Sequence, residues 1–511
     1  MWPVPSDPPL ICSLQEFAMN VFDYLLEQQP ESAPALLTLS AEYSYGEVKA
    51  ASESVADFLF ASGGKKGERV LLLAENGLFW VAAYLGAIRA GMVCVPLPTK
   101  IAAADLEYIL SATEPRLIFA EPRVANLLPE SSKSVPLVTE IPPTGASGDK
   151  AIPTVSEDDL AALMFTSGST GRPRGVMISH GNIIANTDSI IQCLSLTALD
   201  RIMAVLPFHY CFGTSLLHTH LRVGGSLVID SRFMYPEAVL QRMHETRCTG
   251  FAGVPSHYQI LLRKSNLGRM TFPHLRYVQQ AGGQLAPAFI QALRDALPTK
   301  RIFVMYGQTE ATARLSYLPP DELDRKLGSV GKGMPGVQLS VLAEDGLPVA
   351  PQQTGEIVAQ GGNIARGYWR DQEETARSFR DGKLYTGDLA TVDEDGFIYI
   401  VDRAKDFLKC GGKRVSCRHL ENVLLEYDEL IEAAVVGIPD EVLGEAALAY
   451  VVPRNPKAQP TPEQLDTHCR SRLPLSFVPK QFVVLSSLPK NSSGKVLKPL
   501  LKTQALAALQ N

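Results

Sequence analysis

The sequence predicts an α/β fold, with a large N-terminal body of mixed, largely parallel β-sheets covered by helices and a small α+β domain at the C-terminal end. Three observations carry this prediction. Short apolar runs alternate with helical patterns of about 10–15 residues, an order typical of βαβ units. The apolar runs are nearly continuous, as expected for strands that are buried on both faces. A basic, glycine-bearing stretch just after residue 400 marks a change in composition.

The first βαβ unit is predicted between residues 70 and 98. Val70–Ala74 (VLLLA) forms its first strand, Gly77–Arg89 its helix and Val93–Pro98 its second strand. A second helix over Ala102–Thr113 then leads to a strand at Leu117–Ala120. Because helices separate these strands, we expect them to be parallel.

Further strands are predicted at Leu163–Thr166, Met203–Pro207 and Ser226–Asp230. Glu130–Ser156 is rich in Ser, Pro, Thr and Lys, and is interpreted as a surface connection. Late in the body, Asp393–Gly396 (DEDG) predicts a turn between two strands.

The composition of the chain excludes several classes of protein. Its 511 residues are 46% hydrophobic and 20% charged, which is ordinary globular usage and excludes collagen-like, coiled-coil and wholly disordered chains. The net charge of −6 argues against a protein that coats nucleic acid or anionic membrane.

No membrane span or secretion signal is predicted. The longest apolar run, Gly77–Ile88, has 12 residues and falls short of the ~20 that cross a bilayer. The first ten residues show no signal-peptide pattern. The eight cysteines are scattered, without metal-ligand spacing, as expected of free thiols. Together these observations predict a cytoplasmic location.

The charge differs between the two parts of the chain. Residues 401–511 hold 15 Lys and Arg against 12 Asp and Glu, so they carry +3 and the remainder carries −9. This asymmetry fits either ordinary variation or a cationic lobe that meets polyanionic substrates. We predict a body over residues 1–404 and a lid domain over residues 405–511.

The strongest local signal is the segment Leu163–Val176 (LMFTSGSTGRPRGV). Its Ser, Thr and Gly residues follow an apolar strand, and a second strand is predicted at Gly175–His180, ahead of a helix over Gly181–Cys193. Such a loop can turn backbone N–H groups and hydroxyls towards a phosphate chain. The spacing is not that of a Walker A loop. A flexible linker is the alternative, which the flanking strands disfavour. The predicted phosphate-binding residues are Thr166, Ser167, Gly168, Ser169, Thr170 and Gly171.

This segment resembles the phosphate-loop signature of adenylate-forming enzymes, which include acyl-CoA synthetases, luciferases and the adenylation domains of peptide synthetases. The family pattern ends in Pro-Lys-Gly, whereas this chain has Arg174 in place of the lysine. The positive charge is kept, although the planar guanidinium group of arginine replaces the compact ammonium group of lysine. The resemblance also implies a β-barrel-like subdomain in the body and a mobile C-terminal domain.

Arg301–Ala311 (RIFVMYGQTEA) is similar to a second motif of the family. The resemblance implies that Tyr306 stacks on adenine beside Gly307, that Thr309 binds the α-phosphate, and that Glu310 binds Mg²⁺ together with Thr166. Mg²⁺ suits this role because it takes few protein carboxylates and several phosphate oxygens. Taken alone, Glu310 would be interpreted as a solvated surface acid.

Other family motifs follow in the family's order. Gly282, Gly283 and Gln284 match a strip beside the base, where missing side chains allow a ring to approach. Asp388, within Tyr385–Leu389 (YTGDL), matches the ribose-binding aspartate, and Arg403 would also contact ribose.

The C-terminal part matches the family at three places. Lys405 corresponds to the hinge. Lys409, Gly411 and Gly412 match a loop that would face the thiol after the domain turns. Lys495, within Pro489–Lys498 (PKNSSGKVLK), matches the catalytic lysine, which fits a site where negative charge shifts during attack.

By resemblance, four segments line the pocket for the acid, namely Pro207–Ser215, Gly253–His257, Gln279–Gly282 and Gln308–Ala313. Relatives that adenylate amino acids have an aspartate where this chain has His209, so an α-ammonium would lack a partner. We therefore expect a fatty, aryl or other non-α-amino acid. His209 is interpreted either as a movable aromatic gate or as a packed, hydrogen-bonded histidine. The predicted pocket residues are His209, Tyr210, Phe212, Gly213, Val254, Ser256, Gln280, Gly282 and Gln308.

The resemblance implies an ATP- and Mg²⁺-dependent ligase. A carboxylic acid would first become an acyl-AMP, and a thiol would then take the acyl group, with Thr309, Glu310, Lys495 and Lys409 in catalytic roles. The thiol belongs either to coenzyme A or to the phosphopantetheine of a carrier protein. The alternatives are an amino-acid adenylation enzyme that loads a carrier protein, a non-catalytic nucleotide-binding relative and a luciferase-like oxygenase.

Overall fold

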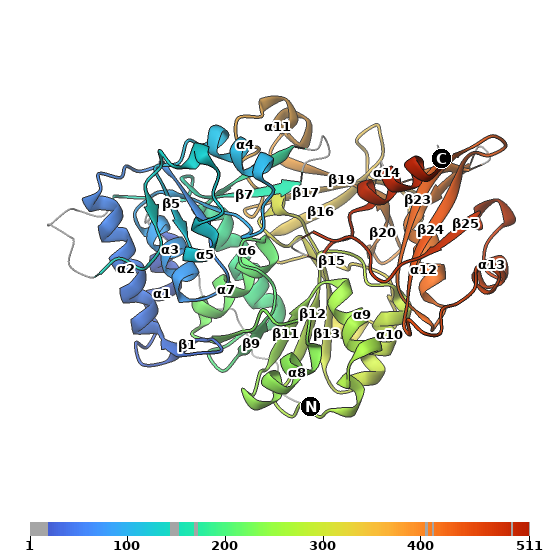
Figure 1. Ribbon diagram of the computed structural model, residues 1–511, viewed down its shortest axis with the longest axis horizontal. Helices are drawn as coiled ribbons and strands as arrows, with labels where there is room; N and C mark the ends of the chain where they lie inside the picture. Colours follow the sequence, from blue (N-terminus) through green and yellow to red (C-terminus); the bar gives the residue numbers. More distant parts are fainter. Residues whose placement is uncertain are drawn as a thin grey trace.

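The computed structural model describes residues 19–143, 153–167, 172–403, 407–410, 413–491 and 494–509, which form four β-sheets with their helices (Figure 1). Three sheets come from residues up to 403, and the fourth from residues after 406. The boundary drawn at residues 404 and 405 stays a prediction. Among the described residues, no helix has the length and apolarity to cross a membrane.

The first sheet is parallel apart from its last strand. Its order is β6-β5-β3-β4-β7-β8, and β7 and β8 form an antiparallel hairpin. Apolar residues of α4 pack in a cluster on one face, and those of α3 belong to the main core. The strands are β3 (Arg69–Leu73), β4 (Val93–Pro96), β5 (Leu117–Ala120), β6 (Leu137–Val138), β7 (Leu160–Ser167) and β8 (Pro173–Ser179). The helices are α2 (Tyr45–Ala61), α3 (Leu78–Arg89), α4 (Ala103–Thr113), α5 (Pro122–Ala125) and α6 (His180–Leu194).

The second sheet has nine strands in the order β15-β14-β13-β12-β11-β9-β10-β1-β2. Its six central strands are parallel, and antiparallel strands occupy both edges. The parallel strands are β1 (Pro34–Leu37), β9 (Arg201–Ala204), β10 (Ser226–Ile229), β11 (Gly250–Gly253), β12 (Tyr277–Gln280) and β13 (Arg301–Tyr306). The edge strands are β2 (Glu42–Ser44), β14 (Ser316–Leu318) and β15 (Lys332–Gly333). The accompanying helices are α1 (Val21–Leu26), α7 (Cys211–Val223), α8 (Pro236–Glu245), α9 (Pro255–Lys264) and α10 (Pro287–Ala296).

The third sheet is antiparallel and stays open, as a half-barrel, which is the form taken by the predicted barrel-like subdomain. The turn predicted at Asp393–Gly396 joins its strands β19 and β20. The strands are β16 (Val337–Leu342), β17 (Gly355–Gly361), β18 (Phe379–Arg380), β19 (Lys383–Val392) and β20 (Ile398–Arg403), with the short helix α11 (Gln372–Ser378).

The fourth sheet forms the C-terminal part, which we call the tail (residues 407–509). Its two faces carry separate apolar clusters, so the tail has its own core. In Figure 1 the tail, in orange and red, lies beside α9 and the third sheet. Its strands are β21 (Phe407–Cys410), β22 (Lys413–Ser416), β23 (Leu430–Asp440), β24 (Gly444–Pro453) and β25 (Gln481–Val484). Its helices are α12 (Cys417–Leu425), α13 (Pro462–Arg470) and α14 (Lys498–Leu509).

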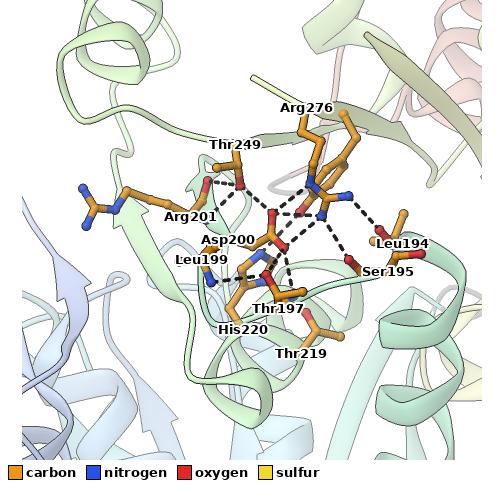
Figure 2. A network of polar contacts seen from close by, with 11 residues as sticks. Leu194, Ser195, Thr197, Leu199, Asp200, Arg201, Thr219, His220, Thr249 and Arg276 are labelled. Atoms are coloured by element: carbon orange, nitrogen blue, oxygen red, sulfur yellow. Dashed lines mark hydrogen bonds and ion pairs between the residues drawn. The ribbon is translucent and has the colours of Figure 1, made fainter. Parts of the chain in front are cut away.

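A buried carboxylate joins the amino ends of the second sheet's parallel strands (Figure 2). Asp200, just before β9, accepts hydrogen bonds from the Thr249 hydroxyl over 2.7 Å and from the Arg276 guanidinium over 2.9 Å. Thr249 and Arg276 directly precede β11 and β12, so one side chain links three strands. Arg276 also donates to the carbonyls of Leu194 and Ser195 at the end of α6. This network stabilises the sheet at the ends opposite to the strands' carboxyl ends.

The structure confirms the predicted fold class and most of the predicted strands, with two differences. The strand predicted over Met203–Pro207 ends at Ala204, because the next backbone groups bond a side chain. The carbonyl of Leu206 accepts from the amide of Asn76, which in turn accepts from the N–H of Phe208, both over 2.8 Å.

The second difference concerns the predicted surface connection Glu130–Ser156. It contains a 3₁₀ turn at Glu130–Ser132 and the edge strand β6, which pairs with β5 in parallel. A strand of two residues is too short to give a periodic pattern in the sequence. Residues 144–152 lie outside the described residues.

Candidate active site

The predicted site residues gather where parallel strands of the second sheet end. Three loops follow the carboxyl ends of β11, β12 and β13, beginning at Val254, Ala281 and Gly307 respectively. In α/β sheets, ligands bind at these ends, because the crossover loops there leave a crevice. The half-barrel sheet and the tail supply the remaining predicted residues.

Tyr306 and Asp388, both predicted to bind the nucleoside, are in direct contact. The Tyr306 hydroxyl at the end of β13 donates a 2.7 Å hydrogen bond to the carboxylate of Asp388 on β19. Both side chains are buried. Arg403 lies opposite Asp388 in the pairing of β19 with β20, so Asp388 links the other two predicted nucleoside ligands, one through the backbone pairing and one through its side chain.

The predicted phosphate loop connects the two strands of a hairpin. Thr166 on β7 pairs with Arg174 on β8, and Ser167 pairs with Pro173. The hairpin therefore holds both ends of the loop in register. The central residues Gly168, Ser169, Thr170 and Gly171 lie outside the described residues, and their contribution stays a prediction.

Arg174, which replaces the lysine of the family pattern, is paired with carboxylates of the half-barrel region. Its guanidinium lies 3.0 Å from Glu374 and 3.6 Å from Asp371, the N-cap of α11. It also lies over the ring of Tyr368, 5.7 Å from the centroid. The planar fork thus binds two acids at once, a geometry in which arginine and lysine are not interchangeable. Its predicted contact with the nucleotide stays a prediction.

Thr309 and Glu310 form a short 3₁₀ turn with Ala311 after β13. The hydroxyl of Thr309 is buried, 3.4 Å from the thiol of Cys211 at the start of α7. Glu310 is half-buried and accepts a 2.9 Å hydrogen bond from the Tyr368 hydroxyl. Burial first, and the Glu310 charge second, raise the pKa of Tyr368, so this hydroxyl stays protonated.

Glu310 and Thr166 have the donor chemistry that Mg²⁺ takes, namely one carboxylate and one hydroxyl, with the other positions left to water and phosphate. Within the part of the chain that the structure describes, no group of three His, Cys, Asp or Glu residues could hold a metal. The donor set therefore fits a metal held largely by substrate phosphates.

The glycine strip after β12 is closely packed. Gly282 has a φ of +82°, and a Cβ there would lie 3.0 Å from a methyl group of Val254. A Cβ on Gly283 would lie 3.2 Å from the ring of Pro255. Side chains at these positions would press against these neighbours, so the strip suits glycine, and its contact with the base stays a prediction.

Four predicted pocket residues surround the same space. A Cβ added at Gly282 would lie 3.6 Å from the Tyr210 hydroxyl and 3.9 Å from the ring of Phe212, in addition to its contact with Val254. Gly213 lies in the first turn of α7 against the carbonyl of Pro207, where a Cβ would come within 2.0 Å. Only glycine allows this start of α7 to pack so tightly.

His209 is half-buried just before α7, and burial lowers its pKa to about 4. The imidazole is therefore neutral at pH 7 and supplies no charge to the pocket.

Several amide atoms of the predicted site have no hydrogen-bond partner although they are buried, a feature that usually marks a place for a ligand or water. These atoms are Oε1 of Gln280, Oε1 of Gln284 and Nε2 of Gln308.

The tail brings its C-terminal loop to the edge of this pocket. The hydroxyl of Ser256 donates a 3.3 Å hydrogen bond to the carbonyl of Gly494, and a Cβ on Gly494 would lie 3.3 Å from Val254. Lys495 follows directly and is exposed, and its backbone N–H donates to the side chain of Asn491 over 2.9 Å.

Lys409 lies elsewhere in the tail. It is exposed on β21, and its backbone N–H donates a 2.8 Å hydrogen bond to Glu445 of the same sheet. Lys405, Gly411 and Gly412 lie outside the described residues, so the hinge and the thiol loop stay predictions.

A small cavity lies along one face of α7. Cys211, Thr214, Ser215 and His218, which share this helix face, line it. Tyr84 also lines the cavity, and its hydroxyl lies 3.0 Å from Nε2 of His218. Cys211 therefore borders both the cavity and the residue predicted to bind the α-phosphate.

The sequence model of a family described as AMP-binding enzyme matches residues 22–369, and that of its C-terminal domain matches residues 419–495. The chain belongs to the AMP-binding enzyme family. Its predicted membership of the adenylate-forming superfamily and its prediction as an AMP-forming acid–thiol ligase are thereby confirmed, with ATP and coenzyme A as substrates of this class.

Curated AMP-binding enzymes cover nearly the whole chain. A feruloyl-CoA synthase of an Amycolatopsis species is 33% identical over 89% of this chain and 92% of its own length. A sulfoacetate–CoA ligase of Cupriavidus necator is 32% identical over 94% of both chains.

Two solved AMP-binding enzymes also resemble this chain. The anthranilate CoA ligase AuaEII, in complex with anthranoyl-AMP, has a TM-score of 0.89 and 25% identity over 98% of this chain and 99% of its own. ATP-bound MatB from Rhodopseudomonas palustris has a TM-score of 0.84 and 29% identity over 95% of this chain and 98% of its own.

The sequence analysis missed three features of this AMP-binding enzyme. The Tyr368 hydroxyl donates a hydrogen bond to Glu310, and Glu374 of α11 forms an ion pair with Arg174. In addition, Arg314 lies buried beside Phe212. Arg314 comes one residue after the last predicted pocket segment. The only sign of its burial in the sequence was its position directly before the apolar residue Leu315.

Proposed function

We propose that this enzyme activates a non-α-amino carboxylic acid as its acyl-AMP and transfers the acyl group to coenzyme A. The observation that carries the proposal is the convergence of Tyr306, Asp388 and the Gly494–Lys495 loop around the ends of β11–β13. These are predicted ligands of the nucleoside and of the reacting groups. They come from three parts of the chain that lie far apart in sequence.

In the first half-reaction, an oxygen of the acid's carboxylate attacks the α-phosphorus of ATP, and pyrophosphate leaves. Lys495 and the hydroxyl of Thr309 would stabilise the negative charge that develops on the phosphoryl oxygens. Asp388 would hold the ribose, and Tyr306 would hold the base. Glu310 and Thr166 would hold Mg²⁺, which when bound would supply Lewis-acid stabilisation of the phosphates.

In the second half-reaction, the thiol sulfur attacks the acyl carbonyl and AMP leaves. We propose that the tail turns at Lys405, withdraws Lys495 and brings the loop of Lys409, Gly411 and Gly412 to the site. Such a hinge motion lets one site serve two reactions. The tail has its own apolar core, which supports a turn of this part of the chain as one body.

The charges of the side chains at the predicted pocket favour one class of acid. His209 is neutral, since burial lowers its pKa to about 4, so it supplies no negative charge to balance an α-ammonium group. A buried guanidinium, that of Arg314, lies beside the pocket residue Phe212 and would repel such a group. Both observations favour acids without an α-ammonium group over amino acids. The names of the relatives do not narrow this class, since feruloyl, sulfoacetyl and long-chain acyl substrates all occur among them.

The acceptor is proposed to be coenzyme A, since the relatives named above are CoA ligases, with a carrier-protein phosphopantetheine as the second candidate. The +3 charge of residues 401–511 suits both polyanionic coenzyme A and an acidic carrier. We also propose a cytoplasmic location, which the seven described cysteines support, as all are free thiols.

The proposal is tested by measuring acid-dependent AMP and pyrophosphate release across a panel of carboxylic acids, with and without coenzyme A. We expect pyrophosphate release with a subset of the acids and a thioester only when coenzyme A is present. A nucleotide-binding protein without turnover would release neither product with any acid, and a luciferase-like oxygenase would consume oxygen.

A further inference from the structure

Arg314 is a buried cation without a partner anion. Its side chain is 2% exposed, and its Nε and Nη2 atoms are buried without hydrogen-bond partners. Among the described residues, no carboxylate forms an ion pair with it. Burial lowers the pKa of Arg314 to about 10, so the guanidinium still carries its charge at pH 7.

The surroundings of the guanidinium are neutral. Its central carbon lies 3.7 Å from the centroid of the Phe212 ring, and the titratable groups that act on its pKa are the thiol of Cys211 and the phenol of Tyr210. Burial raises the pKa of Cys211, so the thiol is uncharged. The cation–π contact with Phe212 stabilises the guanidinium, but by less than the burial of an unpaired charge destabilises it.

Arg314 borders the predicted acid pocket. The guanidinium lies over the ring of Phe212, and a Cβ added at Gly282 would lie 3.9 Å from a carbon of the same ring and 3.6 Å from the Tyr210 hydroxyl. The backbone of Arg314 packs against Gly307, where a Cβ would come within 2.7 Å of the Arg314 Cα. The Arg314 backbone therefore lies at the base of the loop that carries Gln308 and Thr309.

The backbone at this place is strained and fixed. Thr312 has a φ of +63°, in a tight turn in which the N–H of Ala313 donates to the carbonyl of Ala311 over 2.7 Å. The carbonyl of Arg314 accepts hydrogen bonds from the side-chain amides of Asn186 and Asn363. A β-branched residue rarely adopts this conformation, and such strain concentrates at ligand sites. Arg314 is thus held in place rather than free to swing towards solvent.

We infer that Arg314 binds a second anionic group, a carboxylate or a sulfonate, on the acid that the enzyme activates, an inference that rests on the proposed function. The reacting carboxylate is the weaker candidate for this contact. It loses its charge when the acyl-AMP forms, which would leave the buried guanidinium unpaired again. A distal anion keeps its charge through both half-reactions and can accept two parallel hydrogen bonds from the fork.

The test compares matched acids that differ only in the second charge. Glutarate is paired with monomethyl glutarate, and terephthalate with monomethyl terephthalate, and kcat/KM is measured by acid-dependent AMP formation. We expect the wild-type enzyme to prefer the charged member of at least one pair by about 100-fold or more, since a site that lacks its partner group discriminates strongly.

Arg314→Met should reduce kcat/KM for the preferred charged acid by about 100-fold and change that for its ester by less than about threefold. Arg314→Lys keeps a charge and should retain part of the preference. If the wild-type enzyme uses esters and diacids equally, or if Arg314→Met lowers both members of a pair alike, the inference is overturned while the proposed function stands.

Absence of acid-dependent AMP formation with every acid in the larger panel described above would overturn the proposed function, and the inference with it. The wild-type comparison needs no variant, so the inference stays testable even if Arg314→Met does not fold.

Discussion

Ser256 and Gly494 are joined by a hydrogen bond across 238 positions of the sequence, from the hydroxyl of one to the carbonyl of the other over 3.3 Å. Ser256 lies in the first turn of α9, and Gly494 lies in the last loop before α14. A second contact joins the same helix to the tail, since Arg263 pairs with Asp428 over 3.0 Å. These contacts hold the loop of Lys495 beside Val254 and Ser256 of the predicted acid pocket, the position that the proposed first half-reaction needs.

Replacing Lys495 by alanine should reduce acid-dependent pyrophosphate exchange by about 100-fold or more, the usual effect of removing one charge-stabilising group. The fold should be unaffected, because the side chain is exposed. Lys502→Ala, at another exposed lysine of the tail, is the matched control and should keep full activity. Unchanged exchange in Lys495→Ala would remove this lysine from its proposed role.

Replacing Lys409 by alanine should separate the two half-reactions. Pyrophosphate exchange should stay within about twofold of the wild-type rate, whereas thioester formation should fall by about tenfold or more, because Lys409 serves only the second arrangement of the tail. Lys457→Ala serves as an exposed control in the same domain. Equal loss of both half-reactions would contradict the proposed hinge motion.

The hydrogen bond between Tyr306 and Asp388 predicts graded effects on ATP binding. Tyr306→Phe keeps the ring and removes one bond, so the Kd for ATP should rise about fivefold, which corresponds to about 1 kcal/mol. Asp388→Ala also removes the proposed ribose contact and should raise the Kd by about 100-fold. Isothermal titration with ATP measures both values. An Asp388→Ala enzyme that binds ATP as tightly as Tyr306→Phe would argue against the ribose contact.

The sequence analysis succeeded where a signal was local. Val70–Ala74 and Leu117–Ala120 could be predicted as strands because their apolar runs are continuous and lie between helical patterns. The phosphate-loop hairpin was predictable for the same reason, since Leu163 and Val176 lie in apolar runs on either side of a polar loop.

The role of a side chain could not be predicted where it depends on a partner far along the chain. Arg174 is bound by Asp371 and Glu374, almost 200 residues away, and no local pattern encodes that pairing. A lone arginine such as Arg314 is usually solvated, and its burial follows only from the turn at Thr312 and the packing on Phe212.

Asp200→Asn should destabilise the protein without impairing catalysis. Hydrogen bonds from Thr249 and Arg276 leave the pKa of Asp200 below its ordinary value although burial alone would raise it, so the carboxylate is charged and paired. Breaking a buried ion pair costs about 3 kcal/mol. Because the network lies at the amino ends of the strands, kcat/KM should stay within about twofold.

Urea unfolding of Asp200→Asn measures this loss of stability. Glu373→Gln is the control, as it breaks the exposed pair with Arg377 and should change the unfolding free energy by less than about 0.5 kcal/mol. A large fall in kcat/KM for Asp200→Asn in the folded enzyme would show that the network also shapes the site.

Buried His218 predicts a loss of stability in acid. Burial lowers its pKa to about 3, whereas the unfolded chain titrates near 6.5. Below pH 6.5 His218 takes up a proton in the unfolded state but stays neutral in the folded state. The free energy of unfolding therefore falls as the pH falls from about 6.5 towards 3. The expected slope from this one group is about 1.4 kcal/mol per pH unit.

His218→Gln removes the titrating group and keeps a side chain that can bond the Tyr84 hydroxyl. Between pH 7.5 and pH 5, its unfolding free energy should fall by about 2 kcal/mol less than that of the wild-type protein. Urea unfolding followed by tryptophan fluorescence reports on this region, because Trp80 stacks on Tyr84 with ring centroids 4.9 Å apart. Parallel pH profiles for the two proteins would mean that His218 takes up a proton in the folded state near its ordinary pKa, contrary to what its burial beside Tyr84 requires.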